Sequence, residues 1–278
     1  MEYGHAQRSK YECLLFDLDD TLYPLSIGLA VDVTKNIEDF MVEKLGIEQS
    51  KIVELGNLLY KNYGTTMAGL RAIGYNFDYD EYHSFVHGGL PYDKLRSDPI
   101  LRSLLLSLPI RKVIFTNADE VHALKVLNKL GLEDCFEGII CFETLNPIDK
   151  SNATTNNGSH EIFDIIGHFS QPKAGSVLPK TPILCKPSQV SIERALDLAN
   201  IINPHTTLFF EDSVRNVQAG KRVGLDTVLV GKSQKVVGAD YALESIHNIK
   251  EILPQLWEVE KVAEVTYSGV AVKTSVIA

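Results

Sequence analysis

Short apolar runs that end in polar residues recur along the chain and predict five buried β-strands. These strands are expected at 13–16, 113–116, 138–141, 207–210 and 227–230. Apolar residues at helical spacing lie between them and predict helices over 121–130, 188–202 and 214–223. Strands that alternate with helices are typical of a doubly wound parallel sheet, so we expect an α/β fold.

The interval between the first two strands is too long for a simple crossover. Residues 25–99 repeat apolar positions at helical spacing without a convincing strand, which predicts an inserted all-helical domain. A helical layer with no role in the site is the alternative, but ligand sites favour domain interfaces. The core would then be discontinuous, formed by 11–24 and 100–257. Residues 146–182 predict a long irregular loop, and we expect disorder in the tail, 258–278.

The first strand runs into the sequence DLDDT at 17–21. Ligands of open α/β sheets bind at the carboxyl ends of the strands, and alternate residues of a strand lie on the same side. We therefore expect Asp17 and Asp19 to lie side by side at the edge of the sheet. Two such carboxylates repel each other unless a cation or a shared proton relieves them, which favours Mg²⁺ chemistry. A capped strand end is the alternative.

Three later segments end in groups that suit the same chemistry. Thr116 and Asn117 could donate hydrogen bonds to phosphate oxygens, although helix caps use the same residue types. Lys186 could bring a positive charge to a phosphate and a carboxylate, although exposed loop lysines are common. Glu211 and Asp212 could complete an oxygen shell for Mg²⁺ that Asp17 begins.

Together and in this order, the four segments resemble the motifs of the haloacid dehalogenase (HAD) superfamily, most of whose members are phosphatases. The likeness spans about 13–257. It implies a HAD-like doubly wound parallel sheet with the first strand in the centre and an inserted all-helical cap of the C1 type. A cap of this kind closes over the site and excludes water.

The resemblance also implies a role for each matching residue. Asp17 would be the nucleophile that forms an aspartyl-phosphate, and Asp19 the general acid/base, with its backbone carbonyl on Mg²⁺. An acid at Asp19 favours a phosphatase over a dehalogenase, because a halide leaves without a proton. Phosphate binding would fall to Thr116, Asn117 and Lys186. The implied metal ligands are Asp17, Asp19, Glu211 and Asp212.

Within the superfamily, the passages DLDDTLYP at 17–24 and YKNYGTTMAGL at 60–70 resemble the pyrimidine 5′-nucleotidase branch, and among these the plant suppressor-of-disruption-of-TFIIS-like proteins. The second passage, RAIGY at 71–75 and FFEDSVRN at 209–216 are similar to plant xanthosine 5′-monophosphate (XMP) phosphatases. This implies hydrolysis of XMP to xanthosine and phosphate, a step of purine catabolism.

Three alternatives remain open at this point. A pyrimidine 5′-nucleotidase acting on CMP or UMP is one alternative, although Asp20 stands where Asn is common in that branch, which argues against it. A phosphosugar phosphatase or phosphomutase on the same core is the second. The third is a non-catalytic regulatory protein, against which the intact Asp17, Asp19, Lys186 and Asp212 argue.

Aromatic, hydroxyl and basic side chains of the cap region are candidates for reading the substrate. Each could instead pack the cap, as helical spacing of tyrosines does in many proteins. The candidates are Tyr23, Tyr60, Tyr63, Thr65, Thr66, Arg71, His83 and His87.

Composition and charge limit the size of the fold, the kinds of partner and the compartment that we expect. At 278 residues and 45% hydrophobic, the chain can bury a core and form two modest domains. A net charge of −9 disfavours general binding to nucleic acid or membrane surfaces. The resemblance implies instead a small nucleoside monophosphate as partner. The chain shows no apolar run of transmembrane length and no apolar signal region at its polar N-terminus. Four scattered cysteines are typical of buried thiols in a reducing compartment, and we expect a cytoplasmic protein. The oligomeric state stays open.

Overall fold

The computed structural model describes residues 10–147, 162–172 and 175–257. A six-stranded sheet with the strand order β3-β2-β1-β4-β5-β6 forms its centre, and every neighbouring pair is parallel. The strands are β1 (Cys13–Phe16), β2 (Arg111–Phe115), β3 (Gly138–Ile140), β4 (Thr207–Glu211), β5 (Asp226–Val230) and β6 (Tyr241–Leu243). The doubly wound parallel sheet predicted from the sequence is confirmed, with β1 between β2 and β4.

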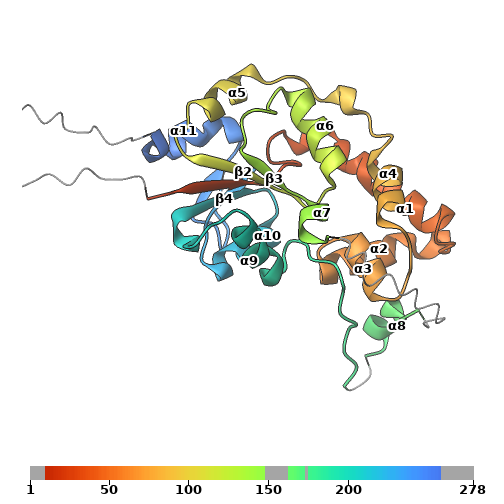
Figure 1. Cartoon of the computed structure of the whole chain (residues 1–278). Coiled ribbons are helices and arrows are strands. Elements are labelled where there is room, and N and C mark those ends of the chain that lie inside the picture. Colours follow the sequence, from red (N-terminus) through yellow and green to blue (C-terminus); the bar gives the residue numbers. More distant parts are fainter. Residues whose placement is uncertain (1–9, 148–161, 173–174, 258–278) are drawn as a thin grey trace, which may run out of the picture.

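Helices cover both faces of the sheet (Figure 1). One face carries α5 (Pro99–Leu106), α6 (Glu120–Leu130) and α11 (Ile249–Ile252). The other carries α9 (Gln189–Leu198) and α10 (Val214–Val223). Because side chains alternate along a strand, β1 contributes to the hydrophobic cores on both faces of the sheet. Leu14 and Phe16 pack in the core under α5 and α6, while Cys13 and Leu15 pack in the core under α9.

Local sequence signals explain where the core helices begin and end. Asp119 caps α6 by accepting a hydrogen bond from the backbone N–H of His122, and α6 ends at Gly131 in the left-handed conformation. In the same way α10 ends at Gly224. The short α7 (Phe142–Leu145) follows β3.

Residues 25–99 form a separate helical layer beside the sheet (Figure 1). Its helices are α1 (Leu29–Glu43), α2 (Ile52–Tyr63), α3 (Thr66–Ala72) and α4 (Tyr79–His87), and this region contains no strand. The layer has its own buried cluster, centred on Phe40, which packs edge-to-face against Tyr82. We call this layer the cap.

Two features depart from the sequence-based expectations. The loop expected over 146–182 contains a helix, α8 (Ile165–Ser170), which Asp164 caps and whose buried Ile165 packs on the cap core. The sequence did not predict this helix, because it is a short apolar stretch between turn residues and its burial depends on contact with a distant segment. The edge strand β6 was also not predicted, since it has only three residues. Two parts of that loop, 148–161 and 173–174, and the tail 258–278 lie outside the described residues.

All four cysteines are buried and none forms a disulfide. Within the described ranges, no helix combines the length and the apolar character that crossing a membrane requires.

Candidate active site

The buried core of the site is an ion cluster around Lys186. Its Nζ atom donates hydrogen bonds to Asp17 Oδ1 (2.5 Å), Glu211 Oε2 (2.8 Å) and the Phe115 carbonyl oxygen (2.8 Å). The Lys186 side chain is 1% exposed, so two carboxylates share one ammonium away from water. All three N–H bonds of Lys186 are thereby used within the protein.

Three strands and one loop position this cluster. Asp17 follows β1, Glu211 ends β4, and the Phe115 carbonyl ends β2, so the carboxyl ends of neighbouring parallel strands converge on Lys186. The Asn117 side chain holds the lysine's backbone on both sides, since its Oδ1 accepts from Lys186 N (2.8 Å) and its Nδ2 donates to Lys186 O (3.1 Å). The Asn117 amide therefore positions Lys186 directly.

The cluster carries more negative than positive charge. Burial and the nearby Glu211 charge raise the pKa of Asp17 to about 7, although Lys186 opposes the shift. Burial, with the neighbouring Asp212, raises the pKa of Glu211 to about 7. Burial and the Asp17 charge raise the pKa of Asp212 to about 6. Ionised carboxylates at such a site need a further cation.

The donor set fits Mg²⁺. Carboxylate oxygens of Asp17, Glu211 and Asp212 lie within 4.8 Å of one another, and Mg²⁺ prefers oxygen ligands from one or two carboxylates. The two Glu211 oxygens already accept from Lys186 and from Ser213 N, which leaves Asp17 and Asp212 better placed as ligands. Next to them, Asp20 Oδ1 is buried without a hydrogen-bond partner among the described residues.

Asp19 lies in a different environment from Asp17. Its Oδ1 accepts hydrogen bonds from Tyr23 OH (2.6 Å) and His122 Nε2 (2.8 Å). Burial alone would raise the pKa of Asp19, but the His122 charge and these hydrogen bonds lower it to about 2. The Asp19 side chain is therefore held as a carboxylate by Tyr23 and His122.

His122 was not singled out from the sequence, yet its ring is fixed at both nitrogens. Tyr92 OH donates to the His87 carbonyl (3.0 Å), so it accepts from His122 Nδ1–H at 2.9 Å while His122 Nε2 donates to Asp19. Both ring nitrogens then carry protons, and although burial opposes it, the Asp19 charge raises the pKa of His122. The Asp19–His122 pair therefore holds a proton.

A cavity of about 480 Å³ lies between the core and the cap, within the usual range for ligand sites. Asp19, Asp20 and Tyr23 form its core wall. Helices α1 and α2 form the opposite wall, with Thr34, Glu38, Asn57 and Tyr60 among apolar neighbours. Thr34, Glu38 and Asn57 were missed in the sequence because only the fold brings α1 and α2 over the acids.

The structure brings only some of the candidate substrate residues to this cavity. Tyr23, Tyr60, Thr66 and His87 line it. Arg71 instead donates to the carbonyl of Tyr75 and lies over the rings of Phe77 and Tyr79, inside the cap.

The remaining candidates have structural partners elsewhere. Thr65 caps α3, and Thr116 Oγ1 accepts from Ala118 N. Tyr63 packs against the cap core, and the His83 side chain faces Asp119.

The cap is fitted closely to the Lys186 segment. Gly64, between α2 and α3, has a positive φ of 93°, and a Cβ atom there would lie 2.4 Å from the Lys186 carbonyl oxygen. Arg215 of α10 donates to the carbonyls of Tyr60 and Lys61 and lies 4.1 Å from the Tyr60 ring centre. The core thereby fixes the position of Tyr60 on the cavity wall.

Comparison with solved structures identifies the fold as that of HAD-type hydrolases. The HAD-hydrolase YfnB of Bacillus subtilis, solved with bound magnesium, superposes with a TM-score of 0.51 at 18% identity, over 89% of this chain and 100% of that one. CbbY of Rhodobacter sphaeroides, solved with phosphate, has a TM-score of 0.50 at 16% identity, over 88% of this chain and 99% of its own. In sequence, the chain is 24% identical to Phosphate metabolism protein 8 of Saccharomyces cerevisiae over 262 residues, which cover 88% of this chain and 72% of that protein. No protein-family model matches the chain.

Proposed function

We propose that the protein is a Mg²⁺-dependent phosphatase of nucleoside 5′-monophosphates, with XMP as its main substrate. The observation that carries the phosphatase proposal is the buried Asp17–Lys186–Glu211 cluster with an excess of acids, set beside a cavity between the core and the cap. The magnesium in YfnB and the phosphate in CbbY agree with such chemistry on this fold.

In the first step, an Asp17 oxygen would attack phosphorus and the bond to the leaving 5′-oxygen would break. The leaving oxygen would take a proton from the Asp19–His122 pair, which lines the cavity. Water would then attack phosphorus of the aspartyl-phosphate and lose a proton to the same pair, which releases phosphate and restores Asp17. Asp17 and Asp212 would hold Mg²⁺, whose charge would neutralise the phosphoryl oxygens.

Lys186 would act mainly through charge and position. Its three N–H bonds reach Asp17, Glu211 and a backbone carbonyl, so it orients the nucleophile and offsets the negative charge that gathers during transfer. Asn117 would support it by fixing its backbone.

The substrate proposal rests on the sequence resemblance and on the polar groups of the cap wall. The Glu38 carboxylate can accept a hydrogen bond from a ring N–H, and the Asn57 amide can both donate and accept. Xanthine offers two ring N–H groups and two carbonyl oxygens, which suit this pair, and Tyr60 offers a ring for stacking.

The test is phosphate release from XMP, GMP, IMP, AMP, CMP, UMP and several sugar phosphates, with Mg²⁺ and with EDTA. We expect Mg²⁺-dependent release that is fastest from XMP. A preference for CMP or UMP would move the substrate to the pyrimidine class, and hydrolysis of sugar phosphates alone would overturn the nucleotide proposal. No release from any substrate would overturn the phosphatase proposal.

The Glu38→Gln variant should raise KM for XMP by about 10-fold, because a charged hydrogen bond to the base contributes ~1.5–3 kcal/mol. Its kcat and its activity on p-nitrophenyl phosphate should change little, since neither depends on the base. Glu43→Gln is a matched control, being an exposed acid on the same helix outside the cavity. Equal effects of the two substitutions on KM would remove Glu38 from the base site.

The His122→Phe variant should lower kcat on nucleotides by about 100-fold, because proton transfer to a leaving oxygen is usually worth ~10²–10⁴. The loss should be smaller with p-nitrophenyl phosphate, whose leaving group needs no proton. His122→Gln, which keeps a donor near Asp19, should recover part of the rate. Equal losses on both substrates would show that His122 only supports the fold.

A further inference from the structure

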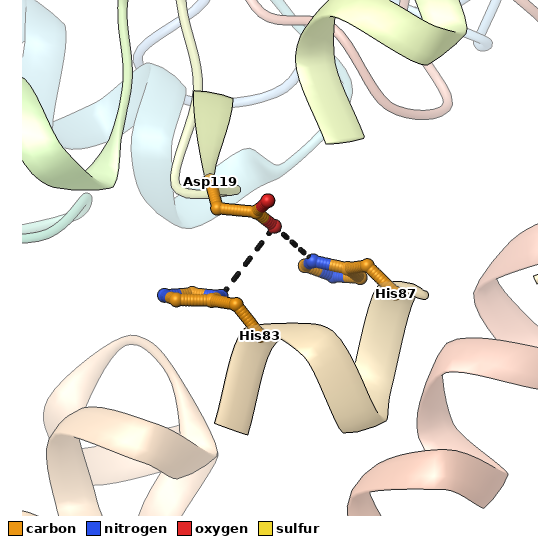
Figure 2. Close-up of side chains that lie close together, drawn as sticks. All are labelled: His83, His87 and Asp119. Carbon is orange, nitrogen blue, oxygen red and sulfur yellow. Dashed lines mark hydrogen bonds and ion pairs between the residues drawn. The ribbon is translucent and has the colours of Figure 1, made fainter. Parts of the chain in front are cut away.

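A second cluster of metal-binding side chains lies between the cap and the core, away from the Asp17 group. His83 and His87 lie one turn apart on α4, and one nitrogen of each ring lies close to Asp119, which precedes α6 (Figure 2). One ligand atom from each of the three residues lies within 4.8 Å of the others. Neighbouring turns of a helix are a common source of paired histidine ligands.

His83 shows that the cluster is incomplete as it stands. Its side chain is 8% exposed, yet neither ring nitrogen makes a hydrogen bond to any described residue. Its Nδ1 atom lies 3.5 Å from Asp119 Oδ1, which is too long for a good hydrogen bond. A buried polar group without a partner is costly, so His83 calls for a ligand that the protein itself does not supply.

Asp119 does not satisfy both histidines. Its Oδ1 already meets His87 Nδ1, and its Oδ2 accepts from the backbone N–H of His122 at the start of α6. Two imidazole nitrogens therefore lie close to the same Asp119 oxygen (Figure 2). Burial also lowers the pKa of His83 to about 4, which keeps the ring neutral, the form that binds metal ions.

We propose that His83 Nδ1, His87 Nδ1 and Asp119 Oδ1 form a binding site for a divalent transition-metal ion of the Zn²⁺ class. Imidazole ligands favour Zn²⁺ and its neighbours, whereas Mg²⁺ and Ca²⁺ prefer oxygen, so the site differs in chemistry from the Asp17 group. His87 also lines the large cavity, which provides an entry path and room for a water as fourth ligand.

An ion at this point would join the two parts of the molecule. Two of its ligands belong to cap helix α4, and the third belongs to the core loop before α6. Metal binding to the folded state alone stabilises that state by mass action. The ion would therefore hold the cap against the core and raise the unfolding temperature.

The site can be tested with Co²⁺ as a spectroscopic probe of Zn²⁺ sites. Tag-free full-length protein in saturating Mg²⁺, which fills the oxygen site, would be titrated with Co²⁺ and its visible absorption recorded. We expect about one Co²⁺ per chain with the intense bands of four- or five-coordinate nitrogen ligation. Zn²⁺ should displace the Co²⁺ and raise the unfolding temperature.

Two variants locate the ion. His87→Gln and His83→Phe should each weaken Co²⁺ binding at least ~10-fold, and His83→Phe should fold well because it replaces unpaired nitrogens next to the Phe142 ring. His247→Gln, at a histidine outside the cluster, and Asp17→Asn should bind Co²⁺ like the wild type. Absence of the bands in the wild type, or their survival in both cluster variants, would overturn the proposal, as would their loss in Asp17→Asn alone.

Discussion

The Asp17→Asn variant should lose phosphatase activity by ~10⁴-fold or more while keeping its fold. Removal of a nucleophile that acts together with its neighbours costs about this much in other hydrolases. An amide oxygen at this position can still accept from Lys186, but it cannot form the aspartyl-phosphate. The measurement is phosphate release from the best substrate in Mg²⁺, beside the wild type.

The same substitution should leave the metal-free protein at least as stable as the wild type. Burial and Glu211 raise the pKa of Asp17 to about 7, above its value in the unfolded chain, so the folded state binds more protons between about pH 4 and pH 7. This contribution to stability is present at low pH and is lost as the pH rises through 7. In EDTA, the gain in unfolding temperature of Asp17→Asn over the wild type should therefore grow from pH 5 to pH 7.5. If the Asp17→Asn variant unfolded, its loss of activity would not show that Asp17 is the nucleophile.

The Lys186→Met variant should show the largest loss of stability, about 3–5 kcal/mol, the usual cost of removing one partner from a buried ion cluster. Asp17 and Glu211 would remain buried without their shared cation. For a chain of this size, the loss corresponds to a fall of roughly 6–20 °C in unfolding temperature. Thermal unfolding in EDTA, followed by circular dichroism, measures it.

Lys221→Met is the matched control, because Lys221 pairs with Asp226 and Asp240 while 41% exposed. Exposed pairs contribute ~0–1 kcal/mol, so this control should shift the unfolding temperature little. The cost of Lys186→Met should shrink as the pH falls, because the two stranded acids can then take up protons. Equal effects of the two substitutions would contradict the buried cluster.

Part of the site could be predicted from the sequence because its signals are local. An apolar run that ends in Asp17 or Glu211 encodes both the strand and the polar end, and parallel strands present their carboxyl ends at one edge. The pairing of Lys186 with these acids crosses 169 residues to Asp17 and 25 to Glu211, yet the motif order implied it through resemblance.

Other features depended on tertiary contacts that no local pattern encodes. In the sequence, His122 is only one polar residue of a predicted amphipathic helix. The fold alone brings its ring to Asp19, which lies 103 residues away. Arg71 lies in a passage that resembles nucleotidases, but cap packing turns it toward Phe77 and Tyr79.

The sequence by itself determined the parallel sheet, the helical insertion and the set of acids with one lysine, since apolar periodicity and strand-end chemistry are properties of short segments. Only the tertiary structure decided which cap residues face the acids, how the proton is held by His122, and that His83 and His87 meet Asp119. These arrangements depend on how α1, α2 and α4 pack over the core. Helix packing depends on how the side chains of distant segments fit together, and a single amino-acid sequence does not show that fit.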